Sequence, residues 1–265
     1  MKSIYAEIMD LAEGTSSGVL VTVVNKDGSG PAVTGTKMIV YCDGKISGTV
    51  GGGSIEKLAI EKAHTIFLTQ KNGIEKYVMD EPGDCTTTGM ICGGTATLFF
   101  EYFAPKNHIY IFGAGHIGKA LVYHLSQLNY HITIIDDRQE ALDQIEEADE
   151  KINLEFIKAL NGKNVVKNSF FIIATYQHQY DDIVLKKIYS SDWQPKYIGI
   201  VSSRKKKEIL FGEIKKYLPG VDLSRAFLPV GLDIGGTLPH EIAISIVAEM
   251  QAVANGKKGG HLRDS

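Results

Sequence analysis

Three glycines near the middle of the chain, Gly113, Gly115 and Gly118, have the spacing of a dinucleotide-binding turn. Such a turn uses the first glycine for its tight bend, the second for close approach of a pyrophosphate and the third for helix packing. The helix that would follow offers free N–H groups and a positive dipole end to a phosphate. Asp136 comes 23 residues after Gly113, where this pattern places an acid that binds a ribose. The spacing therefore predicts phosphate and ribose binding.

The segments on both sides of the glycines have the pattern that this turn requires. An apolar run at 108–112 precedes it, and an amphipathic stretch follows with Ile117, Leu121 and Leu125 on one face. A second apolar run at 132–135 then leads into Asp136, Asp137 and Arg138. We read this order as strand, glycine turn, helix, strand and acid, and we include Arg138 among the candidate cofactor contacts.

His116 lies inside the glycine turn, where ordinary hydride-transfer enzymes do not need an imidazole. It would add a hydrogen-bond donor or a general acid/base next to the phosphate site, so we count it as a cofactor contact. The same residue keeps open the alternative of a Rossmann-like unit whose crevice is empty or repurposed, because a fold does not dictate its ligand.

Two further apolar runs, 169–174 and 197–201, are typical of buried parallel strands, and polar side chains follow each of them. In an open parallel sheet, ligands bind outside the carboxyl ends of the strands, so these side chains are expected beside the glycine turn. The basic run 204–207 also has the ordinary interpretation of a solvated helix face. The candidate residues after these strands are Thr175, His178, Asp181, Ser203 and Arg204.

A second glycine-rich turn, made of Gly51, Gly52 and Gly53, follows a strand and precedes a helix. Successive N–H groups in such a turn can converge into an anion-binding nest. The alternative is a sharp strand-to-helix turn that needs positive φ and binds nothing. The residues leave both interpretations open, and we include the three glycines among the candidate cofactor contacts.

The chain has three cysteines, an odd number without CxxC spacing, which indicates reduced cytoplasmic thiols rather than a disulfide framework. Cys92 stands just before a glycine pair, and it is either a buried inert thiol or an exposed, activated one able to bind soft metal or sulfur. We name Cys92 and His178 as candidate catalytic residues and assign no metal ligands. Cys42 is expected to be structural, and Cys85 is undecided.

The composition excludes several classes of function. Hydrophobic residues make up 44% of the chain, charged residues 22%, and the net charge is −3, which gives no basis for general nucleic-acid binding. No apolar run approaches the roughly 18 residues that a membrane span needs. The first residues carry acids within an apolar pattern, so we expect a helix over 3–13 rather than a signal peptide.

The order of the expected elements indicates two domains, a smaller N-terminal α+β domain at 1–104 and a C-terminal Rossmann-like domain at 105–265 with a parallel sheet. Proline and polar residues at 104–107 suggest the linker between them. In the second domain we also expect a helix over 139–147 and a strand over 153–157. The strands expected in the first domain are 18–25, 37–41, 45–50, 74–79 and 95–102.

Several stretches, taken together, resemble the XdhC/CoxI family of accessory proteins for molybdenum hydroxylases such as xanthine dehydrogenase. They occur in the family's order over about residues 14 to 250. Ala32, Ser202 and His240 depart from the family's usual Arg, Gly and acid, and the first of these removes one anion contact. The matching stretches are GSGPAVTGTKM, GTVGGGSIE, GMICGG, IFGAGHIG, DDR, Thr-x-x-His-x-x-Asp, YIGIVSSRKK and PVGLDIGGTLPHEIAISIVAE.

The resemblance implies that the protein handles the molybdenum cofactor, molybdopterin or its dinucleotide, through sulfuration or insertion into a partner hydroxylase. It implies a xanthine dehydrogenase-type partner and a homodimer, and it leaves room for a cysteine desulfurase as a second partner. We expect the cofactor between the two domains, with Gly51–Gly53 and Cys92 on one side and Gly113–Gly118 on the other. A thiol suits the soft molybdenum and dithiolene end of that cofactor.

Two rival interpretations use the same residues. An NAD(P)-dependent oxidoreductase would hold its cofactor with the three glycines of the central turn and Asp136, and would use His178 as general acid/base. A carrier without catalytic activity would hold and deliver the ligand. Whether the protein is an enzyme is therefore left open.

Overall fold

The structure is a computed structural model that describes residues 2–14, 16–78, 94–163 and 165–264. The chain divides into two compact units, Met1–Lys106 and Asn107–Ser265. The break lies two residues beyond the expected one, because strand β6 (Asn107–Phe112) starts immediately after Lys106.

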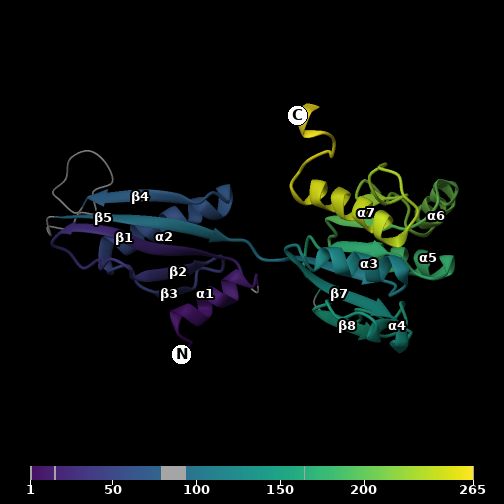
Figure 1. Cartoon of the computed structure of the whole chain (residues 1–265), viewed down its shortest axis with the longest axis horizontal. Helices are drawn as coiled ribbons and strands as arrows, with labels where there is room; N and C mark the ends of the chain where they lie inside the picture. The colour runs from purple at the N-terminus through teal and green to yellow at the C-terminus, as the bar shows by residue number, and fades with distance from the viewer. Residues whose placement is uncertain (1, 15, 79–93, 164, 265) are drawn as a thin grey trace. The chain divides into compact units, whose positions relative to one another are not determined.

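The described part of the first unit is an antiparallel five-stranded sheet with the order β3-β2-β1-β5-β4 (Figure 1). Side chains alternate between its two faces, as strand geometry requires. Val19, Val21 and Val23 pack in a cluster with helix α2, whereas Leu20 packs with Leu11 of helix α1. The elements are α1 (Ile4–Ala12), β1 (Gly18–Gly28), β2 (Lys37–Tyr41), β3 (Ile46–Gly48), α2 (Gly53–Thr69), β4 (Gly73–Val78) and β5 (Gly94–Phe103).

The second unit contains a parallel six-stranded sheet with the order β11-β10-β9-β6-β7-β8. Read from β8, this is the doubly wound Rossmann order, in which strands are added on one side of β6 as far as β8 and then, from β9 onward, on its other side. The elements are β6, α3 (His116–Leu125), β7 (Tyr130–Asp136), α4 (Gln139–Asp143), β8 (Glu150–Asn153), β9 (Phe170–Ile173), α5 (His178–Ser190), β10 (Tyr197–Ile200), α6 (Arg204–Tyr217), β11 (Ala226–Phe227), α7 (Pro239–Ala254) and a 3-10 turn, η1 (Leu262–Asp264).

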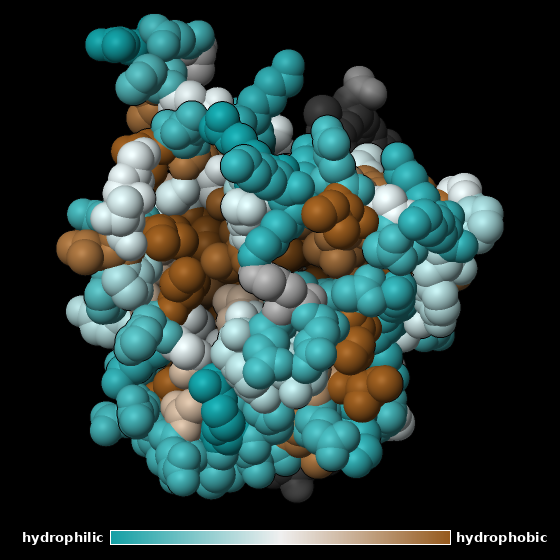
Figure 2. Space-filling model, turned by 90° about the vertical axis from the view of Figure 1, so that its right-hand side faces the viewer, coloured by the Kyte–Doolittle hydropathy of each residue, from teal (hydrophilic) through white to brown (hydrophobic). Residues whose placement is uncertain are grey.

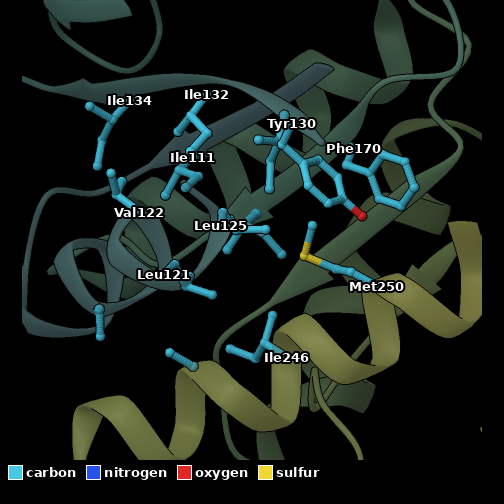
Figure 3. Close-up of a cluster of buried hydrophobic side chains, with 14 of the residues drawn as sticks. Ile111, Leu121, Val122, Leu125, Tyr130, Ile132, Ile134, Phe170, Ile246 and Met250 are labelled. Atoms are coloured by element: carbon cyan, nitrogen blue, oxygen red, sulfur yellow. The ribbon is translucent and has the colours of Figure 1, made fainter. Parts of the chain in front are cut away.

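Helices cover both faces of this sheet. Ile109 and Ile111 of β6 face the cluster formed with α3 and α7, whereas Tyr110 and Phe112 face the cluster formed with α5 and α6. Figure 3 shows the first cluster, with side chains of α3 directed toward Ile246 and Met250 of α7. The near-continuous burial of the strands is the pattern of a parallel sheet covered on both sides, and it confirms the predicted α/β fold with a Rossmann-like second unit.

Two expected boundaries in the second unit differ from those observed. The helix after Arg138 ends at Asp143, and the next strand runs over Glu150–Asn153 instead of 153–157. The strand ends early because the Asn153 side chain donates a hydrogen bond to the carbonyl oxygen of Asp136, and Phe156 turns into the core. Among the described residues, every helix is too short or too polar to cross a membrane.

Candidate functional site

A cavity of about 530 Å³ opens at the carboxyl ends of β6 and β9, where the strand order reverses. This is the position at which open α/β sheets hold their ligands. Figure 2 looks onto the right-hand side of Figure 1, and that surface is mostly hydrophilic with a hollow where hydrophobic residues gather. The cavity is lined by Ala114, Gly115, His116, Ile117, Lys119, Arg138, Glu140, Ala141, Gln144, Ala174, Thr175 and Tyr176.

The three glycines of the central turn have different structural requirements. Gly113 has φ +114°, and a Cβ there would overlap the carbonyl oxygen of Ala174, which directly follows the neighbouring strand β9. A Cβ on Gly118 would overlap the carbonyl oxygen of Gly113, so this glycine lets helix α3 lie against the turn. Gly115 has no atom within 4 Å of its Cβ position, and it lines the cavity. The first and third glycines are therefore needed for packing, and the second leaves room for a ligand.

Helix α3 begins at this cavity with its first turn open. Gly115 is the N-cap residue and has no side chain to accept a hydrogen bond from the first N–H groups of the helix, and the first turn contains no acid. Initial N–H groups of a helix have no partner within the helix, and they carry the positive end of its dipole. The arrangement suits an anion, and the exposed residues His116 and Lys119 stand beside it.

The predicted ribose-binding acid, Asp136, has another role in the structure. Its carboxylate is fully buried and accepts four hydrogen bonds. The donors are the backbone N–H of Ala114 at 2.7 Å, the backbone N–H of Arg138 at 3.0 Å, and two guanidinium N–H groups of Arg138 at 2.8 Å each. A carboxylate offers about four lone-pair sites, so these donors use its capacity. The residue anchors the glycine turn from behind, and its sequence-based assignment as a ribose contact is not supported by this geometry.

Hydrogen bonding controls the charge of Asp136. Burial raises the pKa of this carboxyl, but the hydrogen bonds from Arg138 and Ala114 outweigh it and hold the pKa below its usual value. The same pairing raises the pKa of the Arg138 guanidinium. Both groups therefore stay ionised at neutral pH, and the partly exposed member of the pair is the cation.

Arg138 is held in a fixed position at the cavity wall. Its guanidinium carbon lies 4.3 Å from the centroid of the Tyr176 ring, a cation–π distance. The Tyr176 hydroxyl donates a hydrogen bond of 2.9 Å to Asp137 Oδ2, which fixes the ring. Sequence reasoning included Arg138 but missed Tyr176, although it stands next to Thr175 in the segment where polar residues were expected.

The other candidate residues, which follow strands β9 and β10, do not all lie at this cavity. Thr175 lines the cavity, but its hydroxyl donates to Asp181 Oδ1 at 2.5 Å, so these two side chains bond to each other. His178 begins helix α5, and its side chain lies outside the described residues. Ser203 and Arg204 do not line this cavity. Ser203 is the N-cap residue of α6, and the exposed Arg204 lies 3.6 Å from Asp233.

The glycine turn of the first unit binds a carboxylate of its own chain. The backbone N–H of Gly52 donates to Glu56 Oε2 at 3.2 Å, and the Thr49 hydroxyl donates to the same oxygen at 2.5 Å. Gly51 and Gly53 have φ +125° and +60°, and a Cβ on Gly51 would meet the backbone of Ala32 at 2.8 Å. The N–H of Gly51 donates to Thr49 Oγ1 at 3.1 Å, so the N–H groups of Gly51 and Gly52 have partners within the chain, and sequence reasoning missed the contact with Glu56.

The structure describes one of the three cysteines. Cys92 and Cys85 lie outside the described residues, and Cys42 is an exposed free thiol in the first unit. Within the described ranges, no group of three or more His, Cys, Asp or Glu side chains has the arrangement of a metal site. The described residues thus form a cavity at the strand reversal of the Rossmann sheet and no preformed metal centre.

The fold and this cavity define a two-unit protein whose second unit is a Rossmann domain. Residues 109–250 match the family described as the XdhC Rossmann domain, and residues 11–78 match the XdhC and CoxI family. The chain belongs to the XdhC/CoxI family.

The chain is also similar to individual proteins. The chain is 28% identical over 263 residues to YqeB of Escherichia coli (strain K12), described as uncharacterized, covering 97% of this chain and 47% of YqeB. It is 26% identical over 201 residues to a probable xanthine dehydrogenase subunit of Bacillus subtilis (strain 168), covering 73% of this chain and 58% of that protein. The chain thus spans about half the length of the curated relatives it matches.

A solved structure supports the fold. The crystal structure of a protein described as a xanthine dehydrogenase from Bacillus halodurans superposes with a TM-score of 0.53 at 21% identity, over 97% of both chains. At this identity the likeness concerns the fold alone.

Proposed function

We propose that this protein is an accessory factor of a xanthine dehydrogenase-type molybdenum hydroxylase, and that its Rossmann unit binds the phosphate-bearing end of the molybdenum cofactor. In this role it assists sulfuration of the cofactor or its insertion into the hydroxylase. The family and the name of the Bacillus subtilis relative support the hydroxylase as partner. The observation that carries the binding proposal is the open turn at Gly115 and the uncapped start of α3 in a cavity of about 530 Å³.

The residues of the cavity fit one end of such a cofactor. A phosphate needs N–H donors and cations, which the first turn of α3, Lys119 and Arg138 supply. The bound cofactor would bring the molybdenum and dithiolene chemistry that the partner hydroxylase uses. A role for Cys92 at that soft end, and a site shared with Gly51–Gly53, stay predictions from the sequence.

The direct test is hydroxylase maturation. A xanthine dehydrogenase-type hydroxylase is co-expressed with wild-type protein, with Gly115→Val, or with Gly212→Ala as a control in which an open helical glycine outside the cavity is changed. We expect wild type and the control to raise hydroxylase activity and its pterin content equally, and Gly115→Val to lose most of this effect because its side chain fills the approach to the turn. Equal activity with and without the wild-type protein would refute the accessory role.

The role of Cys92 is tested separately. The full chain is purified from a host that makes molybdopterin, and the pterin released from wild type and from Cys92→Ala is compared. We expect a loss of bound pterin or of sulfurated, active hydroxylase in the variant. Undiminished pterin and undiminished activation would remove Cys92 from the proposal.

An NAD(P)-dependent oxidoreductase is the second candidate, favoured by the Rossmann strand order and the glycine turn at its switch point. It predicts protein-dependent oxidation of NADH or NADPH with a panel of small carbonyl compounds. A carrier or accessory factor predicts stoichiometric binding without turnover. Multiple turnovers would favour the enzyme over the accessory factor.

A further inference from the structure

The wall of the cavity at the end of β7 has the opposite charge to the one that its sequence suggests. The acid at this position, Asp136, is fully buried with its four acceptor sites occupied, and Arg138 covers it. A ribose with free hydroxyls is normally held here by an exposed acid, whereas an arginine accommodates a phosphate on the ribose. The group presented to a ligand is the guanidinium, whose side chain is 42% exposed.

We infer that Arg138 forms a subsite for a phosphomonoester dianion, so that the cavity selects ligands carrying a terminal or 2′-phosphate over the same ligands without it. The inference deepens the proposed function and rests on the proposed use of this cavity for a phosphate-bearing ligand. Such a phosphate carries a charge of about −1.5 to −2 at pH 7 and three acceptor oxygens. The planar guanidinium matches these oxygens with parallel N–H donors.

The guanidinium of Arg138 has N–H donors that Asp136 does not use, and its position is fixed. Two of its five N–H groups bind Asp136, and the other three have no hydrogen-bond partner among the described residues. Stacking on Tyr176 and pairing with Asp136 fix the group before a ligand arrives. A fixed donor loses little conformational entropy on binding, which favours affinity.

The neighbouring charges are mixed, and their positions favour an anion. Lys119 lines the cavity as a second cation, whereas Glu140 lines it as an acid. Asp137 lies near Arg138, but it does not line the cavity, and its Oδ2 accepts a hydrogen bond from Tyr176. Because Asp136 and Asp137 already interact with Arg138, the preference for an anion depends on direct contact with the remaining N–H groups of the guanidinium and on Lys119.

Two sources could supply this phosphate, the 2′-phosphate of NADP⁺ or the terminal phosphate of molybdopterin. The first arm measures dissociation constants of NADP⁺ and NAD⁺ for the purified full chain by calorimetry, because the two differ only in the 2′-phosphate. If the 2′-phosphate is the source, NADP⁺ binds about tenfold or more tightly than NAD⁺, as expected for a charge-assisted pair. The second arm measures pterin retained by the chain from a host that makes molybdopterin.

The variants are Arg138→Gln and Arg138→Lys, with Arg263→Gln as a control that removes the same charge from the C-terminal turn η1. Arg138→Gln should abolish a preference for NADP⁺ in the first arm, or lower retained pterin about tenfold in the second, and the arm that responds identifies the source. Arg138→Lys keeps the charge beside Asp136 and so protects the fold, but it lacks the fork and should lose most of the same effect.

The inference is overturned if NADP⁺ and NAD⁺ bind wild type equally, or neither binds, and pterin retention is unchanged by Arg138→Lys. Its failure is distinct from that of the proposed function. Hydroxylase activation by wild type would survive a wrong assignment of Arg138, whereas absence of activation would refute the accessory role whatever ligand the cavity selects.

Discussion

The two glycine turns of this protein start from similar sequence and treat an anion in opposite ways. In both, a strand runs through glycines into a helix whose N-cap is a glycine, Gly52 for α2 and Gly115 for α3. Four residues after the first cap stands Glu56, whose carboxylate accepts the N–H of Gly52. Four residues after the second stands Lys119, and that turn faces a cavity. One turn is closed by an acid of its own helix, and the other is left open to a ligand.

This difference shows what a glycine-rich helix start requires before it can serve as an anion site. Backbone N–H groups at a helix start attract any carboxylate within reach, and the nearest one is often in the helix itself. Glycines alone therefore do not distinguish a binding site from a capped turn. The charge of the residue one turn into the helix distinguishes a binding site from a capped turn, because it decides whether the N–H groups are already used.

The largest expected effect concerns the packing of the open turn. Gly118→Ala places a Cβ on the carbonyl oxygen of Gly113, so the helix must move away from the strand. We expect it to lower the free energy of unfolding by about 3 kcal/mol, measured by urea denaturation of the full chain. Gly212→Ala, at an open helical position of α6, should be neutral or stabilising by up to about 1 kcal/mol. Equal effects of the two changes would contradict this account of the turn.

The acid behind the open turn gives the next largest effect. Asp136→Asn replaces an acceptor of Ala114 and Arg138 by an amide with its own donors, and we expect a loss of about 2 kcal/mol at pH 7. Because the pKa of Asp136 is lower in the folded than in the unfolded protein, this stabilisation is present above the ordinary carboxyl pKa. It is lost as the pH falls through the folded value.

The measurement is unfolding by urea between about pH 7 and pH 3, where carboxyl groups titrate. The gap between wild type and Asp136→Asn should narrow toward the acid end. Asp233→Asn, an exposed acid 3.6 Å from Arg204, should follow wild type throughout. A gap between wild type and Asp136→Asn that does not change with pH would contradict the assigned pairing.

Lys119→Glu gives the open turn an acid at the position that Glu56 occupies in the closed one. We expect the variant to keep its stability and to bind phosphate-bearing ligands about tenfold more weakly, because a carboxylate now competes for the first N–H groups of α3. Calorimetry with NADP⁺, or pterin retention, measures the change. Lys205→Glu, which makes the same charge change on exposed α6, is the control. Unaltered binding by Lys119→Glu would show that the open turn is not the phosphate site.

Glu56→Ala is the converse change and has the smallest expected effect. Removing the carboxylate should cost about 1 kcal/mol, as for the loss of a helix cap. It should also leave the N–H of Gly52 available, so that added inorganic phosphate restores part of the lost thermal stability. Glu61→Ala, an exposed position on the same helix, serves as the control. A variant that loses stability without responding to phosphate would show that Glu56 caps a turn unable to hold a free anion.

The sequence predicted the architecture well, because periodic patterns and glycine spacing depend on local rules. The roles of Gly113 and Gly118, and the open position of Gly115, agree with those expected from the spacing alone. The two-unit order and the Rossmann sheet followed from the succession of strands and helices. The sequence also shows that Glu56 and Lys119 differ in charge. This difference can be interpreted only when the first residue of each helix is known.

Contacts between side chains that are distant in the sequence could not be predicted from such local patterns. Spacing placed Asp136 at the right strand end, yet its burial depends on the path of Arg138 and on the N–H of Ala114. Ser203 and Arg204 were expected in the same site because they also follow a strand. Their strand, β10, lies beyond β9 and away from the reversal between β6 and β9, so they face other surroundings.

The position of the cavity over the strand reversal has a consequence for the dynamics of the Rossmann unit. Strands β6, β7 and β8 form one half of the sheet and β9, β10 and β11 the other, joined where Gly113 lies against Ala174. A ligand resting on Gly115 and Thr175 touches both halves at once. Binding of such a ligand should therefore slow amide hydrogen exchange in β6 and β9 together. The protected amides should lie along the boundary between the two halves of the sheet rather than in one helix.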